Sequence, residues 1–98
     1  MSMITLDDAI NIAREYLHSV RVTPPLELEL LLDDVIEFEY GWVFFYQSKE
    51  YLKTGDILDA LGGNAPIIVN KFDGSLHITG TAHPVEKYIS DYVKDLKK

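Results

Sequence analysis

Hydrophobic residues near the N-terminus recur at the spacing of an amphipathic helix. They form one apolar stripe: Leu6, Ala9, Ile10, Ala13, Tyr16, Leu17 and Val20. Thr5 can cap this helix, and Asp7 and Asp8 fall in its first turn, where the helix dipole favours negative charge. The run Thr23-Pro24-Pro25 ends the helix, because neither proline can donate a helical hydrogen bond.

The C-terminal residues predict a second amphipathic helix. Pro84 suits the first position of a helix, and the lysines at 94, 97 and 98 suit its negative end. The apolar stripe of this helix is Val85, Tyr88, Ile89, Tyr92, Val93 and Leu96.

Two segments between these helices predict a first β-hairpin. Residues 35–40 alternate in polarity, residues 42–47 are rich in β-branched and aromatic side chains, and Gly41 marks the turn. A two-residue turn at Tyr40-Gly41 divides the side chains between two faces. One face is aliphatic and aromatic, with Ile36, Phe38, Val43 and Phe45. The other mixes acids with aromatics, namely Glu37, Glu39, Trp42, Phe44 and Tyr46.

A second hairpin is predicted farther along, with the loop 71–74 between its strands. The pair Asp73-Gly74 supplies a positive-φ position in that loop. A four-residue loop places Ile67, Val69, Leu76 and Ile78 on one face, and Ile68, Asn70, Ser75 and His77 on the other. The segment 48–62 between the hairpins is irregular, with short helical turns expected at 49–52 and 57–61.

The order of these elements predicts one α+β domain spanning residues 1–98. We expect an antiparallel sheet of about four strands in two hairpins, with the N-terminal and C-terminal helices packed on one face. The aliphatic faces would then form the core. The face with Trp42, Phe44 and Tyr46 would be free, or else covered by the segment 48–62. A register change of one residue would exchange the faces of a strand.

Charge narrows the possible partners. Sixteen acidic and nine basic residues give a net charge of −7, which repels nucleic acids and anionic membranes. The chain has no cysteine, which excludes disulfides and cysteine-ligated metals. No secretory signal or run of about 20 apolar residues is present, so we expect a cytoplasmic protein.

The acidic residues are concentrated in one stretch. Residues 22–48 contain no lysine or arginine but carry Glu27, Glu29, Asp33, Asp34, Glu37 and Glu39. A solubilising surface is one interpretation, and a face that binds a basic partner is the other. In the second case the expected contacts are Asp33, Asp34, Glu37 and Glu39, with Trp42, Phe44 and Tyr46 as anchors.

No motif in the sequence indicates catalysis, a cofactor or a metal. The serines lie in no nucleophile elbow, the glycines form no phosphate loop, and His18, His77 and His83 are not spaced as a helical metal pair. The acids lack the spacing of a calcium loop. We therefore expect a binding protein without catalytic residues or cofactor. An enzyme with an unrecognised site is a less favoured alternative.

Several short motifs in a fixed order resemble one family. They are Gly41-Trp42-Val43-Phe44-Phe45-Tyr46, Thr54-Gly55-Asp56, Gly63-Asn64-Ala65-Pro66-Ile67-Ile68-Val69, Asp73-Gly74, Gly80-Thr81 and Pro84-Val85-Glu86-Lys87-Tyr88-Ile89. The chain resembles the immunity protein 35 family, also described as the YrhB-like domain. This resemblance implies a bacterial cytoplasmic protein that binds and neutralises the cognate toxin of a polymorphic toxin system. It supplies no catalytic residues. A chaperone-like binding domain without a unique toxin partner is the alternative, and the sequence leaves the oligomeric state open.

Overall fold

The chain folds as an α+β domain, as predicted. The computed structural model describes residues 3–19, 27–55 and 65–97. Its helices are α1 (Leu6–Ser19), the 3-10 helix η1 (Leu32–Asp34), α2 (Lys49–Thr54) and α3 (Val85–Leu96). Its strands are β1 (Leu28–Leu30), β2 (Ile36–Phe38), β3 (Gly41–Phe44), β4 (Tyr46–Ser48), β5 (Ile67–Asn70) and β6 (Leu76–Ile78). An antiparallel four-stranded sheet has the order β2-β3-β5-β6, and β1 pairs with β4 in a separate antiparallel ladder.

The start of α1 is fixed by reciprocal capping between Thr5 and Asp8. The Asp8 backbone N–H donates to the Thr5 hydroxyl over 3.2 Å, and the Thr5 N–H donates to the Asp8 carboxylate over 3.1 Å. These contacts satisfy backbone donors that a helix N-terminus otherwise leaves unpaired. The predicted cap is confirmed, whereas the predicted stop at Pro24-Pro25 lies outside the described residues.

The two predicted hairpins are present, and their faces follow the predicted division. In the first, Phe38 pairs with Gly41 and Glu37 with Trp42, so the turn is Glu39-Tyr40 and lies one residue earlier than predicted. This moves the pairing by two residues, which preserves the alternation of side chains. In the second hairpin the four-residue loop 71–74 is confirmed, with Val69 paired to Leu76 and Gly74 at φ 71°.

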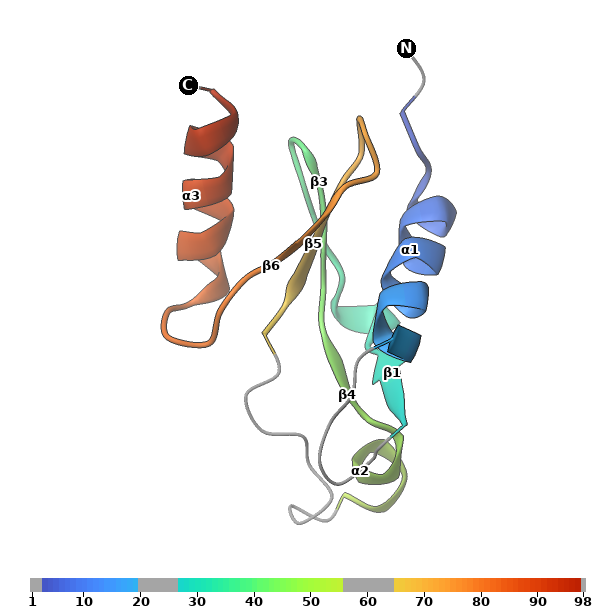
Figure 1. Ribbon diagram of the computed structural model, residues 1–98. Coiled ribbons are helices and arrows are strands. Elements are labelled where there is room, and N and C mark those ends of the chain that lie inside the picture. Colours follow the sequence, from blue (N-terminus) through green and yellow to red (C-terminus); the bar gives the residue numbers. More distant parts are fainter. Residues whose placement is uncertain (1–2, 20–26, 56–64, 98) are drawn as a thin grey trace.

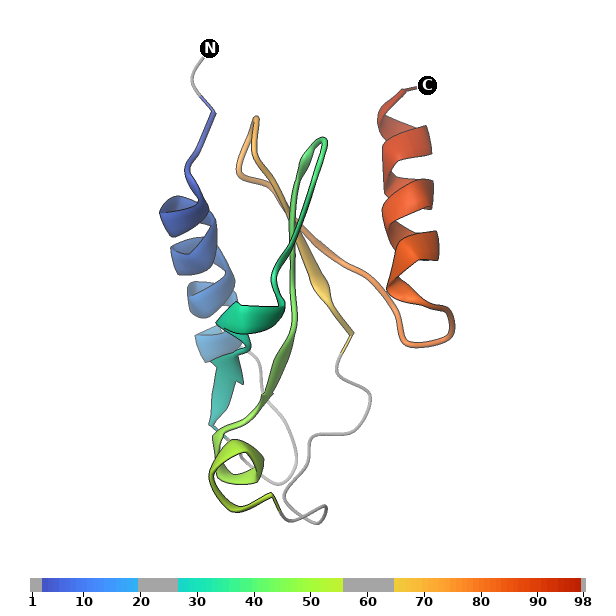
Figure 2. The same cartoon turned by 180° about the vertical axis from the view of Figure 1, so that it is seen from behind.

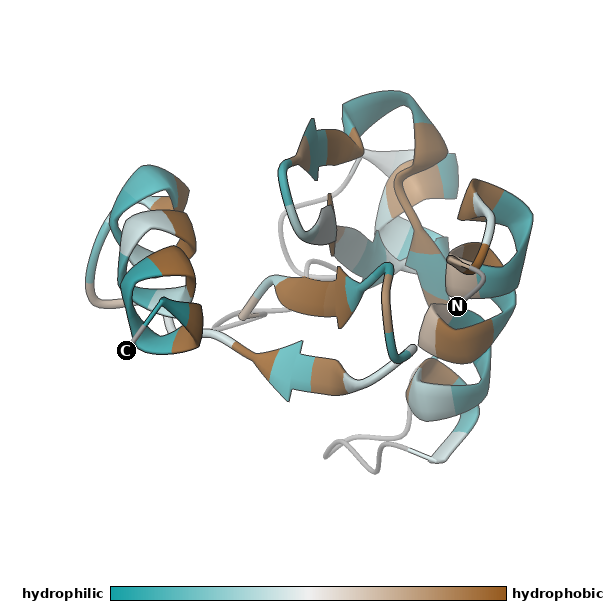
Figure 3. Cartoon of the chain, turned by 90° about the horizontal axis from the view of Figure 1, so that it is seen from above, coloured by the Kyte–Doolittle hydropathy of each residue, from teal (hydrophilic) through white to brown (hydrophobic). Residues whose placement is uncertain are grey.

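The two terminal helices lie on opposite faces of the sheet, not on one face as predicted (Figure 1 and, from behind, Figure 2). α1 packs on the face that holds Trp42 and Phe44. On the other face, the Tyr92 ring of α3 contacts Phe38 and His77, with ring centroids 6.1 and 4.9 Å apart. The view from above places the strands between the two helices (Figure 3). β3 and β5 are therefore buried along their whole length.

A short helix follows β4 directly. The buried Ser48 hydroxyl accepts a hydrogen bond of 3.0 Å from the Tyr51 N–H, which caps α2, and Gly55 ends it at φ 72°. The helical turn predicted at 49–52 is confirmed and extends to Thr54. The turn predicted at 57–61 lies outside the described residues.

Candidate protein-binding surface

The acids of the lysine-free stretch are exposed, but they do not share one surface. Asp33 and Asp34 lie in η1, Glu37 lies in the middle of the edge strand β2, and Glu39 lies in the β2–β3 turn. Glu27 and Glu29 lie at β1, beside α2. The sequence brings these carboxylates close along the chain, whereas the fold distributes them over different elements.

Two of the candidate acids are paired with lysines. The Lys71 ammonium lies 3.3 Å from the Glu37 carboxylate and 5.3 Å from the centre of the Trp42 ring. Only 16% of the Lys71 side chain is exposed, so its charge is fixed beside that carboxylate. Glu39 lies 3.9 Å from Lys97, the residue that follows α3, and both side chains are more than half exposed. The second pair is therefore weak, because solvent screens it.

Of the four acids expected as contacts, Asp33 and Asp34 carry the charge that is least compensated. Both are exposed, and within the described ranges neither forms an ion pair. Leu32, the first residue of η1, is 44% exposed beside them. This part of the surface thus joins an accessible apolar side chain to two carboxylates.

The aromatic residues expected as anchors are core residues, so of the two alternatives for their face, free or covered, the structure shows the covered one. Trp42 and Tyr46 are 6% and 8% exposed, and Phe44 is completely buried. They pack with Ala9, Ala13 and other apolar residues of the core. Burial raises the pKa of the Tyr46 hydroxyl, and the nearby Tyr16 adds to this effect. The element that covers them is α1. The sequence pattern of one hairpin could not show which sheet face each helix would take.

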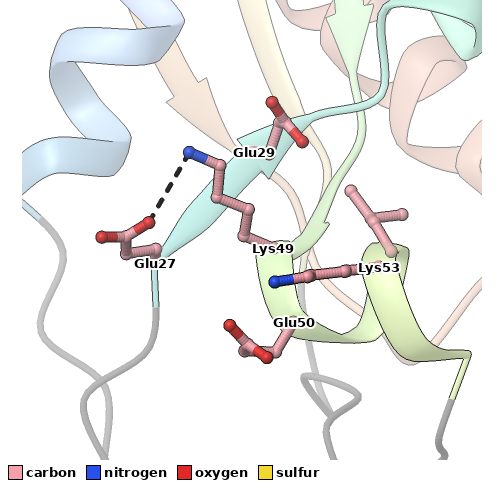
Figure 4. A pocket seen from close by; sticks show the side chains of 6 residues that line it. Glu27, Glu29, Lys49, Glu50 and Lys53 are labelled. Carbon is pink, nitrogen blue, oxygen red and sulfur yellow. Dashed lines mark ion pairs between the residues drawn. The ribbon is translucent and has the colours of Figure 1, made fainter.

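A shallow hollow beside α2 was not predicted. It lies at the opposite end of the molecule from the hairpin turns (Figure 1), and Figure 4 shows the side chains that line it. It is lined by Glu27, Glu29, Lys49, Glu50, Leu52 and Lys53, and Glu27 lies 3.6 Å from Lys49. Three glutamates and two lysines line it, so the hollow offers no strong field of one sign. Detecting it in the sequence would have required the pairing of β1 with β4, which brings residues about 20 positions apart into contact.

Asp73, Ser75 and His77 form a hydrogen-bonded chain beside the β5–β6 turn. The Ser75 hydroxyl donates to the Asp73 carboxylate over 2.6 Å and lies 2.9 Å from His77 Nε2. The hydrogen bonds from the Ser75 hydroxyl and N–H lower the pKa of Asp73. In a hydrolytic triad the serine proton is directed to the histidine, which the carboxylate orients. Here the serine hydroxyl donates its hydrogen bond to the carboxylate and not to the histidine. These three side chains therefore stabilise the turn without activating a nucleophile.

Two other kinds of feature, metal sites and membrane-spanning helices, bear on what the described residues can do. Among the residues that the structure describes, no group of three or more histidine or acidic side chains could hold a metal ion. In the same ranges, no helix combines the length and apolar character needed to cross a membrane.

Comparison with known proteins decides the family. The model of the family described as immunity protein 35 matches residues 7–91. The chain belongs to the immunity protein 35 family. A protein of Escherichia coli (strain K12), described as "Uncharacterized protein YrhB", is 38% identical over 96 residues, which cover 98% of this chain and 94% of that protein. No solved structure matches the chain. The resemblance predicted from the motifs is thereby confirmed, and this immunity protein 35 member shares its domain with a relative of nearly equal length.

Proposed function

We propose that this chain is an immunity protein that binds the cognate toxin of a bacterial polymorphic toxin system and neutralises it as a stoichiometric complex. The observation that carries this proposal is the family match, which extends over most of the chain. An acidic domain with exposed carboxylates suits the task, because charge complementarity speeds association with a basic partner and disfavours other partners.

Asp33 and Asp34 are the principal contacts in this proposal. They lack ion-pair partners among the described residues, and Leu32 beside them supplies apolar surface that the buried Trp42, Phe44 and Tyr46 do not present. Glu39 contributes at the end of the hairpin. Glu37 contributes less, since Lys71 already compensates its charge.

Co-expression tests the function. We expect a neighbouring gene to encode the toxin domain. That domain should stop growth when expressed alone, and the wild-type chain should restore growth and form a complex of fixed stoichiometry with it. Failure of the wild-type chain to protect would show the function to be wrong. Suppressed aggregation of unrelated denatured proteins, without any selective complex, would favour the chaperone-like alternative instead.

A pair of double variants then tests the surface. Asp33→Lys with Asp34→Lys should slow association with the toxin about tenfold or more at low salt, and the difference should shrink as salt rises. Glu27→Lys with Glu29→Lys is the matched control, because it makes the same charge change in the same stretch at another surface. Equal association rates for the two variants would refute the assignment of Asp33 and Asp34 as toxin contacts, while leaving the proposed function intact.

A further inference from the structure

The strand β6 is an open edge of the four-stranded sheet. Within residues 3–19, 27–55 and 65–97 it is the last strand in the order β2-β3-β5-β6, and there it pairs with β5 alone. Its side chains are accessible, since His77 is exposed and Ile78 is 47% exposed. An accessible edge strand is a template for pairing with another strand.

The register shows which backbone groups of β6 point away from the sheet. The Asn70 N–H donates to the Ser75 carbonyl over 2.9 Å, and the Thr79 N–H donates to the Pro66 carbonyl over 3.0 Å. Ile68 and His77 are paired midway between these contacts, so alternation makes them a hydrogen-bonded pair. The N–H and C=O groups of Leu76 and Ile78 therefore point outward, at the free edge.

This edge lacks the charged side chains and prolines that often block pairing. Residues 75–82 contain no lysine, arginine, aspartate, glutamate or proline. The other edge strand of the sheet, β2, carries Glu37 at its centre, with its ion pair to Lys71. Charges, prolines, bulges and very short strands are the common means by which native proteins protect an edge. β2 carries such a charge, whereas β6 is short but carries neither a lysine, arginine or carboxylate nor a proline.

We propose that β6 pairs with β6 of a second copy of this chain, in an antiparallel ladder centred on His77. The N–H and C=O of Leu76 in each copy then form hydrogen bonds with the C=O and N–H of Ile78 in the other copy. This is possible because both residues expose these groups at the same edge. The strand is thus complementary to itself, and every outward backbone group of the three-residue strand finds a partner. This joins two sheets into one continuous sheet.

The side chains agree with this arrangement. Leu76 and Ile78 lie on the face of α1, so the seam brings apolar side chains together there. The two His77 residues lie opposite each other on the face of α3, as a pair without direct backbone hydrogen bonds. Residues 75–82 contain no lysine, arginine, aspartate or glutamate, so the net charge of −7 on each chain acts on the seam only from outside this segment.

Single cysteines test this register, because the natural chain has none. Opposed residues in such a pair have Cα atoms about 4.5 Å apart, which suits a disulfide. His77→Cys should therefore give a covalent dimer under mild oxidation. Ile78→Cys is the matched control, since its two copies lie diagonally, about 7–8 Å apart, and should crosslink poorly. Leu52→Cys on α2 measures random collision.

Two further measurements complete the test. Light scattering on the wild-type chain should show a mass that rises with concentration toward twice the monomer, and Ile78→Lys should abolish the rise. Circular dichroism checks that each variant keeps its fold. A wild-type chain that stays monomeric at millimolar concentration would overturn the proposal. Crosslinking of His77→Cys no greater than that of Leu52→Cys, or a dimer that Ile78→Lys leaves intact, would do the same.

Discussion

The side chain of Asn70 joins three parts of the fold, and removing it should cost much stability. Asn70 is 4% exposed, and its oxygen accepts from the Phe72 N–H over 2.8 Å and from the Asp73 N–H over 3.3 Å. Its amide nitrogen donates to the Tyr92 hydroxyl of α3 over 2.9 Å. One side chain thus closes the β5–β6 turn and ties α3 to the sheet.

The magnitude follows from these three hydrogen bonds. Each contributes about 0.5–1.5 kcal/mol net, so Asn70→Ala should lower the free energy of unfolding by about 2–4 kcal/mol. For a domain of this length that corresponds to a fall in Tm of about 10–25 °C. Tyr92→Phe removes only the hydroxyl contact and should cost about 1 kcal/mol.

Urea unfolding followed by Trp42 fluorescence and far-UV circular dichroism measures both variants. The variant that combines Asn70→Ala with Tyr92→Phe should be more stable, by about 0.5–1.5 kcal/mol, than the sum of the two single losses predicts. The reason is that both substitutions remove the same Asn70–Tyr92 hydrogen bond. An Asn70→Ala chain within about 0.5 kcal/mol of the wild type would refute this reasoning, because losses that small are typical of surface positions. Strict additivity would refute the link between Asn70 and Tyr92.

Further predictions concern a glycine, the tryptophan and an aspartate. Gly41→Ala should unfold the domain or destabilise it by more than about 3 kcal/mol in urea titrations, because the added Cβ would collide with the Val69 carbonyl. Near wild-type stability would contradict the close pairing of β3 with β5 at this position. Trp42 emission should be blue-shifted and resistant to quenchers, whereas ready quenching would mean that α1 does not cover it. The Asp73 carboxyl should titrate below its usual pKa near 3.8 in an NMR titration, and Ser75→Ala should raise that pKa; an unchanged pKa would exclude the hydrogen bonds as its cause. Because the folded-state pKa is lowered, this group stabilises the fold above the unfolded pKa, and that contribution is lost as pH falls through the folded value.

Local patterns were sufficient for much of the fold. The Asp73-Gly74 pair and the length of its loop determine the register of the second hairpin, and the Thr5 cap determines the start of α1. The turn of the first hairpin was misplaced by one residue, yet the faces were correct, because a shift of two residues in pairing keeps each side chain on its face.

The arrangement of the helices, and with it the site, could not be predicted in the same way. Both faces of β3 and β5 carry large apolar side chains, so the pattern cannot say which face receives α1. That choice depends on packing between elements far apart in the sequence. It places Trp42, Phe44 and Tyr46 in the core rather than on a free surface. Lys71 was missed because nothing nearby in the sequence reveals its contact with Glu37.

The two terminal helices differ in how firmly they are held, which has a consequence for the motions of the domain. α1 contributes three buried residues, whereas α3 contributes none and meets the sheet chiefly through Tyr92. Segments with few buried contacts open at a lower free energy than the whole domain unfolds. The amides of α3 should therefore exchange with deuterium earlier than those of α1. Opening α3 would uncover the sheet face around Phe38 and Ile68 while the core beneath α1 stays closed.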